Sequence, residues 1–382
     1  MGGPGRESGA DASAGLIGAK PAAPRLLSVS IRNFRCITAA ELELDSECSV
    51  VTGPNASGKT SLLEALFFLG RGRSFRAAHS GELIQHGERS FLVSSAVGAR
   101  LPGTRVGVAY ERDAFRVRIG GEDRRRLADL AAWVPVSVID PEVHALVDGP
   151  PEQRRRFVDW GVFHVEPSFG ETWRRYQRAL RQRNAALRGA SARQAVRAWN
   201  DTVAELGEQL GGARERYLAA ASPGLQRLAS ELVGRPVSCR YQRGWSRDKS
   251  LAQALTDGLE RDLEQGATQS GPHRADLILD VAERGARRQV SRGQQKLLAS
   301  ALVLGQVRDI AAAQAHRPLL LLDDPAAELD AAAQRRLLSA VRDSGVQRVV
   351  TALDPAVASV LGAHTLFHVE QGAVSRVLQS ET

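Results

Sequence analysis

Residues 50–61 read Val50-Val51-Thr52-Gly53-Pro54-Asn55-Ala56-Ser57-Gly58-Lys59-Thr60-Ser61, which contains the pattern G-x-x-x-x-G-K-[ST] of a phosphate-binding loop. Apolar residues precede the pattern, and apolar side chains recur at helical spacing from Ser61 to Leu69. Strand, glycine loop and helix is the order that the motif requires. We therefore predict nucleotide binding by Gly53, Pro54, Asn55, Ala56, Ser57, Gly58, Lys59, Thr60 and Ser61.

The residue types of this loop suit phosphate binding. Gly53 and Gly58 let the backbone turn tightly, so that successive N–H groups point inward. The following helix N-terminus adds a partial positive charge. Lys59 is expected to reach the β- and γ-phosphates and the Thr60 hydroxyl to ligate Mg²⁺. The alternative is a chance glycine turn, but every fixed position and both flanks match the motif.

The 382-residue chain carries a formal net charge of +8, mostly from arginine. That charge favours an anionic partner, nucleic acid first and a membrane surface second, although a compositional bias of the source genome would give the same excess. Cys36, Cys48 and Cys239 show neither metal-ligand spacing nor a disulfide framework, which fits a reducing cytoplasm. No apolar run approaches the length of a membrane span. With nucleic acid as the preferred anionic partner, we expect no membrane association.

Composition changes divide the chain into four parts. Residues 1–24, rich in Gly, Ala, Ser and Pro, are expected to form a disordered tail. Strand-like segments dominate residues 25–140, helical periodicity dominates residues 141–264, and both alternate in residues 265–382. The sequence therefore predicts an α/β ATPase lobe, with a mixed sheet and helices, interrupted by an inserted and mostly helical arm lobe.

The arm lobe is expected to hold long helices at residues 169–188 and 191–220. Arginine pairs such as Arg181 with Arg183 lie on them and are either solvated or in contact with DNA. Near the phosphate loop, Gly70-Arg71-Gly72-Arg73-Ser74-Phe75-Arg76 places three arginines around one aromatic residue. Arg71, Arg73 and Arg76 are candidate DNA-backbone contacts, and a solvated loop is the alternative.

A second half of the nucleotide site is predicted by the apolar run Pro318 to Asp324, which ends in two carboxylates. A continuous apolar run is typical of a buried parallel strand, and ligands bind at the carboxyl ends of such strands. Asp323 is therefore expected to hold Mg²⁺, and Asp324 to polarise the attacking water. The alternative is a pair of helix-capping aspartates.

A third motif lies before a helix that is expected from Leu297. Its hydroxyl and adjacent backbone N–H groups offer another phosphate-binding geometry, with a plain helix cap as the alternative. The candidate residues are Ser291, Arg292, Gly293 and Gln294.

The order of these motifs resembles the ABC-type ATPases of chromosome maintenance (the SMC-like class) and, in detail, the RecF family of replication and repair proteins. The resemblance covers nearly everything after Pro24. It rests on Asn33-Phe34-Arg35, Gly53 to Ser61, Gly70 to Arg76, Pro141-Glu142, Arg154-Arg155-Arg156-Phe157, Arg178-Ala179-Leu180, Gln182-Arg183-Asn184, Gly271-Pro272-His273-Arg274, Ser291 to Lys296, Leu320 to Asp324 and Glu328-Leu329-Asp330.

The resemblance implies a head-to-tail ATP sandwich. The phosphate loop of one subunit, with Arg35, would bind ATP, and Ser291 to Gln294 of a second subunit would close over the γ-phosphate. ATP would drive homodimerisation on single-strand gaps beside duplex DNA, and weak, DNA-stimulated hydrolysis would release it. Family knowledge further implies RecR and RecO mediator proteins as partners, recombinase loading, a role in the SOS response, and action at the nucleoid.

Departures from the family pattern concern the same site. Ala327 stands where relatives usually have Ser, and Pro325 where they often have Val. The wider class often has Glu at the position of Asp324 and His at a switch position that Thr351 is expected to occupy, which favours slow turnover. Glu142 is the candidate replacement for the glutamine that senses Mg²⁺ in that class.

Other functional classes compete with a DNA-repair ATPase. The ATP-hydrolysing subunit of a membrane transporter shares the phosphate loop and S-x-G-Q, but basic charge and the helical insert argue against it. A chromosome-organising protein with long arms needs a longer insert than this chain has. A P-loop kinase would leave Ser291 to Lys296 without a role.

Overall fold

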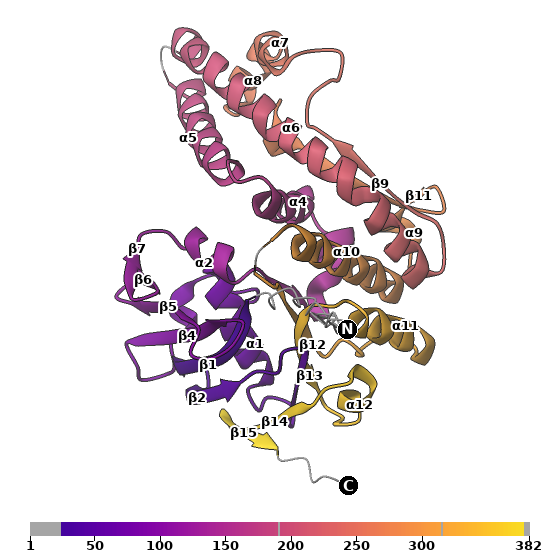
Figure 1. The fold of residues 1–382 in the computed structure, drawn as a ribbon. Coiled ribbons are helices and arrows are strands. Elements are labelled where there is room, and N and C mark those ends of the chain that lie inside the picture. The colour runs from indigo at the N-terminus through magenta and orange to yellow at the C-terminus, as the bar shows by residue number, and fades with distance from the viewer. Residues whose placement is uncertain (1–23, 190–191, 315, 378–382) are drawn as a thin grey trace, which may run out of the picture.

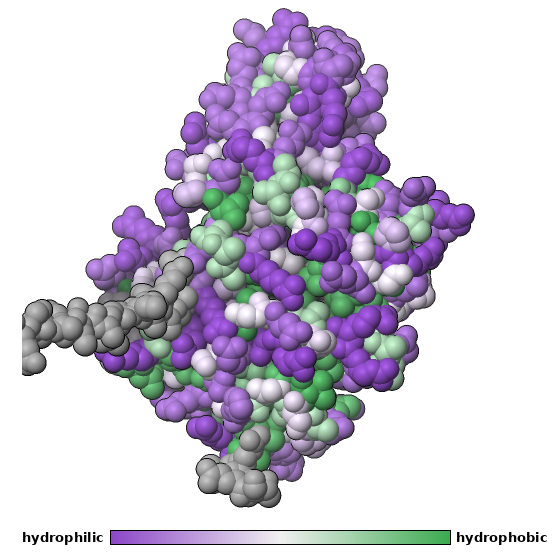
Figure 2. Space-filling view, turned by 45° about the vertical axis from the view of Figure 1, so that its right-hand side comes forward, coloured by the Kyte–Doolittle hydropathy of each residue, from purple (hydrophilic) through white to green (hydrophobic). Residues whose placement is uncertain are grey.

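The computed structural model describes residues 24–189, 192–314 and 316–377, so nearly all of the predicted tail, residues 1–24, lies outside the described residues. The described chain forms an α/β head from which a helical arm projects (Figure 1). The surface of the arm is mostly hydrophilic (Figure 2). Among the described residues, none of the helices combines the length and apolar character needed to cross a membrane.

A largely parallel sheet lies at the centre of the head. Its strand order is β15-β14-β3-β13-β12-β8, with β15 antiparallel to its neighbour. Helices or a second sheet cover both of its faces, which is why Leu319–Asp323 is buried along its whole length. The bounds are β3 Cys48–Thr52, β8 Val136–Ile139, β12 Leu319–Asp323, β13 Gln347–Ala352, β14 Thr365–Glu370 and β15 Ala373–Val377.

A second, antiparallel sheet packs on the other side of helix α1 (Lys59–Arg71). Its order is β2-β1-β4-β5-β6-β7. Because α1 is buried all round from Leu62 to Gly70, it has no amphipathic stripe and instead fills the space between the sheets. The bounds are β1 Arg25–Phe34, β2 Ile37–Glu43, β4 Ser90–Gly98, β5 Thr104–Glu111, β6 Ala114–Ile119 and β7 Glu122–Arg124.

The arm is built on the long helix α6 (Ala192–Val233), which pairs with α5 (Phe169–Leu187). The prediction that this helix ends at Ala220 is wrong, because it continues through Pro223. Leu225, Leu228 and Leu232 are buried against the core that includes α10 (Arg292–Ala313). Burial of these side chains outweighs the hydrogen bond that the proline cannot donate.

The tip and base of the arm carry the other elements between the two halves of the head. These include a small sheet of order β11-β10-β9, in which β10 pairs with β9. The predicted boundary at residues 264–265 stays a prediction, although this pairing joins strands from its two sides. The bounds are α4 Pro151–Val165, β9 Val237–Gln242, α7 Leu251–Asp257, α8 Leu259–Gln265, η3 Pro272–Arg274, β10 Asp276–Val281, β11 Arg284–Gly285 and α9 Ala286–Gln289.

Short helices complete the head. Their bounds are η1 Ser80–Leu83, α2 Ala128–Trp133, η2 Pro141–His144, α3 Ala145–Asp148, α11 Ala331–Arg342 and α12 Val357–Leu361. Helix α10 begins at Arg292, earlier than the predicted Leu297, because Ser291 and Gln294 form a reciprocal capping box. The S-x-G-Q motif therefore forms the first turn of a helix.

Candidate nucleotide-binding site

Three parallel strands end side by side at the predicted site. In the sheet register, Thr351 of β13 lies opposite Val51 of β3 on one side and Asp323 of β12 on the other. The phosphate loop starts directly after β3, and α1 starts at Lys59. The register therefore brings Asp323 next to the loop, although 263 residues separate Asp323 from Thr60.

The loop adopts backbone conformations that demand glycine. Gly53 and Gly58 have φ angles of 150° and 117°, which side chains rarely tolerate. A Cβ on Gly53 would lie 2.2 Å from the Val369 carbonyl oxygen at the end of β14. The Gly372 N–H also donates to the Ser57 carbonyl over 2.8 Å. The C-terminal β14–β15 hairpin thus supports the phosphate loop, a contact that the motif alone does not reveal.

Lys59 and Thr60 are the first residues of α1 and point to different partners. The Lys59 ammonium is 2.7 Å from the carbonyl oxygens of Gly53 and Pro54. Burial lowers the pKa of Lys59, while the carboxylates of Asp323 and Asp324 act in the opposite direction. The Thr60 hydroxyl is 2.9 Å from one carboxylate oxygen of Asp323 and 3.1 Å from the other. The site thus brings together a buried ammonium, a hydroxyl and a carboxylate. The ammonium suits a phosphate group, and the hydroxyl and carboxylate oxygens suit Mg²⁺.

Asp323 and Asp324 have distinct surroundings. Asp323 also accepts a hydrogen bond from the Thr351 hydroxyl at 2.8 Å, and that hydroxyl accepts one from the Asp324 N–H at 3.0 Å. Asp324 has a φ of 45°, so the chain turns sharply straight after the strand. Burial raises the pKa of Asp324, whereas the nearby charge of Lys296 lowers it. Neither aspartate caps a helix; Asp330 caps α11 instead.

Sequence reasoning missed Asp140, which directly follows β8, the neighbour of β12. Burial, followed by the negative charges of Asp323 and Glu142, raises the pKa of Asp140 to about 6. The Glu142 side chain itself is 75% exposed, and its carboxylate is 3.8 Å from the His144 ring. Asp140 is therefore better enclosed than the predicted Glu142. A polar residue at the end of a short apolar strand was the available signal.

Arg35, a predicted nucleotide contact, forms an ion pair in this structure. Its guanidinium makes two 3.0 Å hydrogen bonds to the Glu64 carboxylate of α1, which is fully buried. The Ser74 hydroxyl donates to the same carboxylate and accepts from the backbone N–H groups of Arg76 and Ala77. Glu64 thereby links the loop after α1 to the turn that carries Arg35.

The candidate residues Ser291, Arg292, Gly293 and Gln294 lie at the first turn of α10. Ser291 and Arg292 are exposed. Among the hydrogen bonds of the described residues, none joins this turn to the phosphate loop of the same chain. Its neighbour is the loop after β12, since a Cβ on Gly293 would lie 3.7 Å from the Glu328 carbonyl oxygen.

The three candidate DNA contacts after α1 differ in position. The Arg71 guanidinium lies 3.4 Å above the ring of Trp160 in α4, and burial lowers the pKa of Arg71. This placement argues against a direct phosphate contact by Arg71. Arg73 and Arg76 are exposed and retain the predicted role as a hypothesis. Arg183 is another correction among the arm arginines, because its side chain is fully buried against Asp262.

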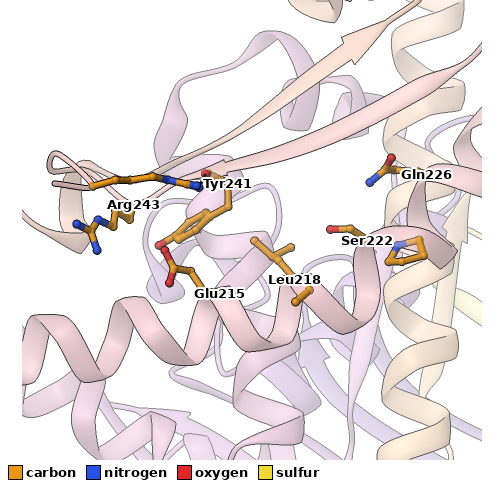
Figure 3. A pocket seen from close by; sticks show the side chains of 9 residues that line it. Glu215, Leu218, Ser222, Gln226, Tyr241 and Arg243 are labelled. Carbon is orange, nitrogen blue, oxygen red and sulfur yellow. Dashed lines mark hydrogen bonds between the residues drawn. The ribbon is translucent and has the colours of Figure 1, made fainter.

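A hollow lies elsewhere, on the arm between α6 and the segment from β9 onward (Figure 3). It has a volume of about 580 Å³ and is open to solvent. Tyr241 and Glu215 point toward one another across it, and Arg243 lies at its edge. None of its lining residues belongs to the phosphate loop or to the end of β12. We therefore place the nucleotide site at the strand ends and not in this hollow.

Comparisons with known proteins agree with this geometry. The family model described as the RecF/RecN/SMC N terminal domain matches residues 25–375. A protein of Vibrio vulnificus named DNA replication and repair protein RecF is 35% identical over 351 residues, which is 91% of this chain and 98% of the relative. The chain belongs to the RecF family. The RecF protein of Pseudomonas aeruginosa is 37% identical over 361 residues, covering 92% and 97% of the two chains.

Solved structures show the same fold. The recombination mediator protein RecF, solved with ATP and assigned to the RecFOR pathway, matches with a TM-score of 0.84 at 23% identity over 95% of this chain and 100% of that one. An Smc head domain from Pyrococcus furiosus matches with a TM-score of 0.57 at 15% identity, covering 93% and 96% of the two chains.

Two sequence-based predictions are confirmed by these findings. The fold is an ABC-type ATPase head with a helical insert, and the function is that of a RecF-family protein of DNA replication and repair. The alternative of a transporter subunit is not supported.

Proposed function

We propose that this chain is an ATP-dependent DNA-binding protein of recombinational repair. It dimerises head to tail when ATP is bound, holds DNA at the junction of a single-strand gap and duplex, and releases it after slow hydrolysis. The contact among Thr60, Asp323 and Thr351 carries the proposal, because it joins a phosphate loop to the carboxylate that ends a parallel strand.

Gly53 to Ser61 would hold the phosphates of ATP through their backbone N–H groups and the α1 N-terminus. Lys59 would exchange its two carbonyl acceptors, on Gly53 and Pro54, for phosphate oxygens. The carbonyl oxygens are neutral, and a charged phosphate oxygen is the stronger hydrogen-bond acceptor. Thr60 and Asp323 would hold Mg²⁺, with Asp140 or Glu142 as a further oxygen donor. When bound, Mg²⁺ neutralises charge that develops between the β- and γ-phosphates.

Asp324 would polarise the attacking water, because its backbone turn and the Thr351 hydrogen bond direct it to the same strand ends. Its side chain is shorter than the glutamate common in this class, which fits weak ATPase activity. The protein would then act mainly as a switch, with hydrolysis stimulated by DNA.

Dimerisation is supported by the position of Ser291 to Gln294. This turn is exposed in part and is not hydrogen bonded to its own phosphate loop within the described chain. The backbone N–H groups of Arg292 and Gly293, which the capping box of Ser291 and Gln294 does not use, would close over the γ-phosphate bound to a second copy. Arg35 would join that site if nucleotide competes with Glu64 for its guanidinium.

DNA would be contacted through exposed arginines, of which Arg73 and Arg76 lie in the segment that follows α1. The names of the relatives point to DNA replication and repair and to the RecFOR pathway. The partners that we propose are single-stranded and double-stranded DNA and RecR- and RecO-like mediator proteins. The proposed setting is the cytoplasm, at the nucleoid.

Sedimentation with and without ATP·Mg²⁺ and a gapped duplex tests this function. The wild-type protein is expected to change from monomer to dimer with ATP. Lys59→Ala should bind ATP about 10- to 100-fold more weakly, because a charge-assisted phosphate contact is lost, and should remain a monomer. Ser291→Arg should bind ATP normally and also remain a monomer. Dimerisation of Lys59→Ala at the wild-type ATP concentration would contradict the nucleotide site, and loss of ATP binding by Ser291→Arg would contradict the head-to-tail arrangement.

The salt dependence of DNA affinity tests the phosphate contacts. In a double variant, Arg73→Gln with Arg76→Gln, the negative slope of log affinity against log salt should become shallower by about 2, one unit per lost phosphate contact. The matched control is Arg116→Gln with Arg118→Gln, because both of these exposed arginines already pair with Asp123. Equal slopes for wild type and the first double variant would remove Arg73 and Arg76 from the DNA interface.

A further inference from the structure

Lys296 is a buried lysine in the second turn of the long helix α10. Its relative exposure is 1%, and it lies one turn after Ser291, the N-cap of that helix. Its ammonium donates a 2.7 Å hydrogen bond to the backbone carbonyl of Ala327. Buried lysines are rare unless a partner holds them, so this contact has a reason beyond packing.

The acceptor lies in the connection from β12 to α11, which begins with Asp324 and ends with the helix cap Asp330. Two residues of this connection, Asp324 and Glu328, have φ angles of 45° and 67°. Conformations of that kind persist only where surrounding contacts hold them. Lys296 supplies such a contact from outside the connection, between the two strained residues.

The same connection also contacts the S-x-G-Q turn. The closest approach to Gly293 is at the Glu328 carbonyl, and the exposed pair Arg292–Glu328 is 3.8 Å apart. A surface pair at that distance contributes little, whereas the buried Lys296 bond is short and shielded from solvent. Lys296 is therefore the strongest recorded polar link between this connection and α10.

We propose that Lys296 is a positioning residue that makes Asp324 and the S-x-G-Q turn move as one unit, and so couples the two ATP sites of the dimer. The inference rests on the proposed function, in which Asp324 serves the subunit's own ATP while Ser291 to Gln294 serve the ATP of the other subunit. When the S-x-G-Q turn of a subunit closes over the ATP of the other subunit, the Asp324 carboxylate of the first subunit would be positioned at its own ATP.

Lys296→Met tests this role in the full-length protein. ATP affinity should stay within about threefold of wild type, because the phosphate loop is untouched. Hydrolysis per bound ATP should slow 10- to 100-fold, and the cooperativity of hydrolysis with ATP concentration should disappear. Lys296→Arg should restore most of both, since it also donates to the Ala327 carbonyl. Lys249→Met is the matched control, because that lysine is exposed and pairs only with Asp257 among the described contacts.

Mixed dimers separate coupling from a local effect. One subunit carries Asp324→Asn, so that only the ATP on the other subunit's phosphate loop is hydrolysed. Lys296→Met is then placed either in the subunit that supplies the working Asp324 or in the subunit that supplies the working S-x-G-Q turn. Slowing in both arrangements supports the proposal, and slowing in only one overturns it.

Two further outcomes are decisive. Wild-type hydrolysis and cooperativity in Lys296→Met would overturn the role of Lys296 even if the wild-type protein dimerises as proposed. A wild-type protein that stays monomeric with ATP would instead refute the proposed function, and this is measured first. If Lys296→Met does not fold, Lys296→Gln takes its place: its side chain is one bond shorter and cannot make the same short contact with the Ala327 carbonyl, so it should show the same loss of cooperativity.

Discussion

Buried charges are paired differently in the arm and at the nucleotide edge of the head, which is the edge where the central parallel strands end beside the phosphate loop. In the arm, Arg183 is fully buried but donates to Asp262, Thr268 and Asn200 over 2.7–2.9 Å. At the nucleotide edge, Asp140, Asp323 and Asp324 crowd together, and Lys59 and Lys296 have backbone carbonyls as their recorded acceptors.

The difference separates structural charges from functional ones. A buried ion pair whose guanidinium also donates to neighbouring side chains holds one geometry and leaves little for a ligand to do. Burial, together with the negative charge of Asp323, raises the pKa of Asp140 and of Asp324. Such carboxylates, beside lysines without a recorded carboxylate partner, are better satisfied by a bound cation and polyphosphate. We therefore expect neutralising substitutions to have opposite effects on stability in the two regions.

The largest expected effect is in the arm. Arg183→Met should lower the free energy of unfolding by about 3–5 kcal/mol, because it leaves Asp262 buried without its partner. Denaturant unfolding measures this change. Arg181→Met is the control on the same helix, since Arg181 is exposed, and it should change stability by less than about 0.5 kcal/mol. Similar values for the two variants would contradict the structural role of the buried pair.

A second effect concerns the boundary between arm and head, where His164 is buried against Trp160. Burial, and then the charge of Arg71, lowers the pKa of His164 to about 3. This folded-state pKa lies below the ordinary 6.5, so the unfolded chain takes up a proton more readily than the folded protein. The free energy of unfolding therefore has its full value above pH 6.5 and falls as the pH drops toward 3. At pH 5 the loss is about 2 kcal/mol.

His164→Phe should reduce the loss of stability between pH 7 and pH 5 by about 2 kcal/mol, as measured by urea unfolding at each pH, while the share of the buried His273, whose pKa burial lowers to about 4, remains. The exposed His86→Phe provides the comparison and should leave the wild-type dependence in place. An unchanged pH dependence in His164→Phe would mean that another group is responsible.

The smallest effect has the opposite sign and lies at the nucleotide edge. Asp324→Asn should stabilise the protein without ligands by a few tenths of a kcal/mol, because it removes a half-buried charge that solvent partly screens and asparagine tolerates a positive φ. The raised pKa of Asp324 means that this gain is present at neutral pH and vanishes in acid. The same variant should hydrolyse ATP at least about 100-fold more slowly. Destabilisation measured without Mg²⁺ would show that Asp324 belongs with the structural charges.

The sequence alone was sufficient for features that depend on backbone conformation or on one strand. The glycines of the phosphate loop and the buried strand that ends at Asp323 follow from local rules on φ angles and apolar runs. The helix cap at Ser291 was only an alternative reading of its motif, and the start of α10 was predicted too late in the chain. These rules require particular residue types at particular spacings. The fold class and the order of motifs could therefore be predicted before any tertiary contact was known.

Tertiary structure decided which charged side chain meets which partner. Arg35 pairs with Glu64, Arg71 stacks on Trp160 and Arg183 is buried, although all three arginines are equally plausible surface cations in the sequence. Asp140 is buried near Asp323, and Lys296 contacts the Ala327 carbonyl. Both arrangements bring together residues that are far apart in the chain. The physical reason is that desolvation and pairing depend on what packs around a charge, and that is set by long-range contacts and not by its sequence neighbours.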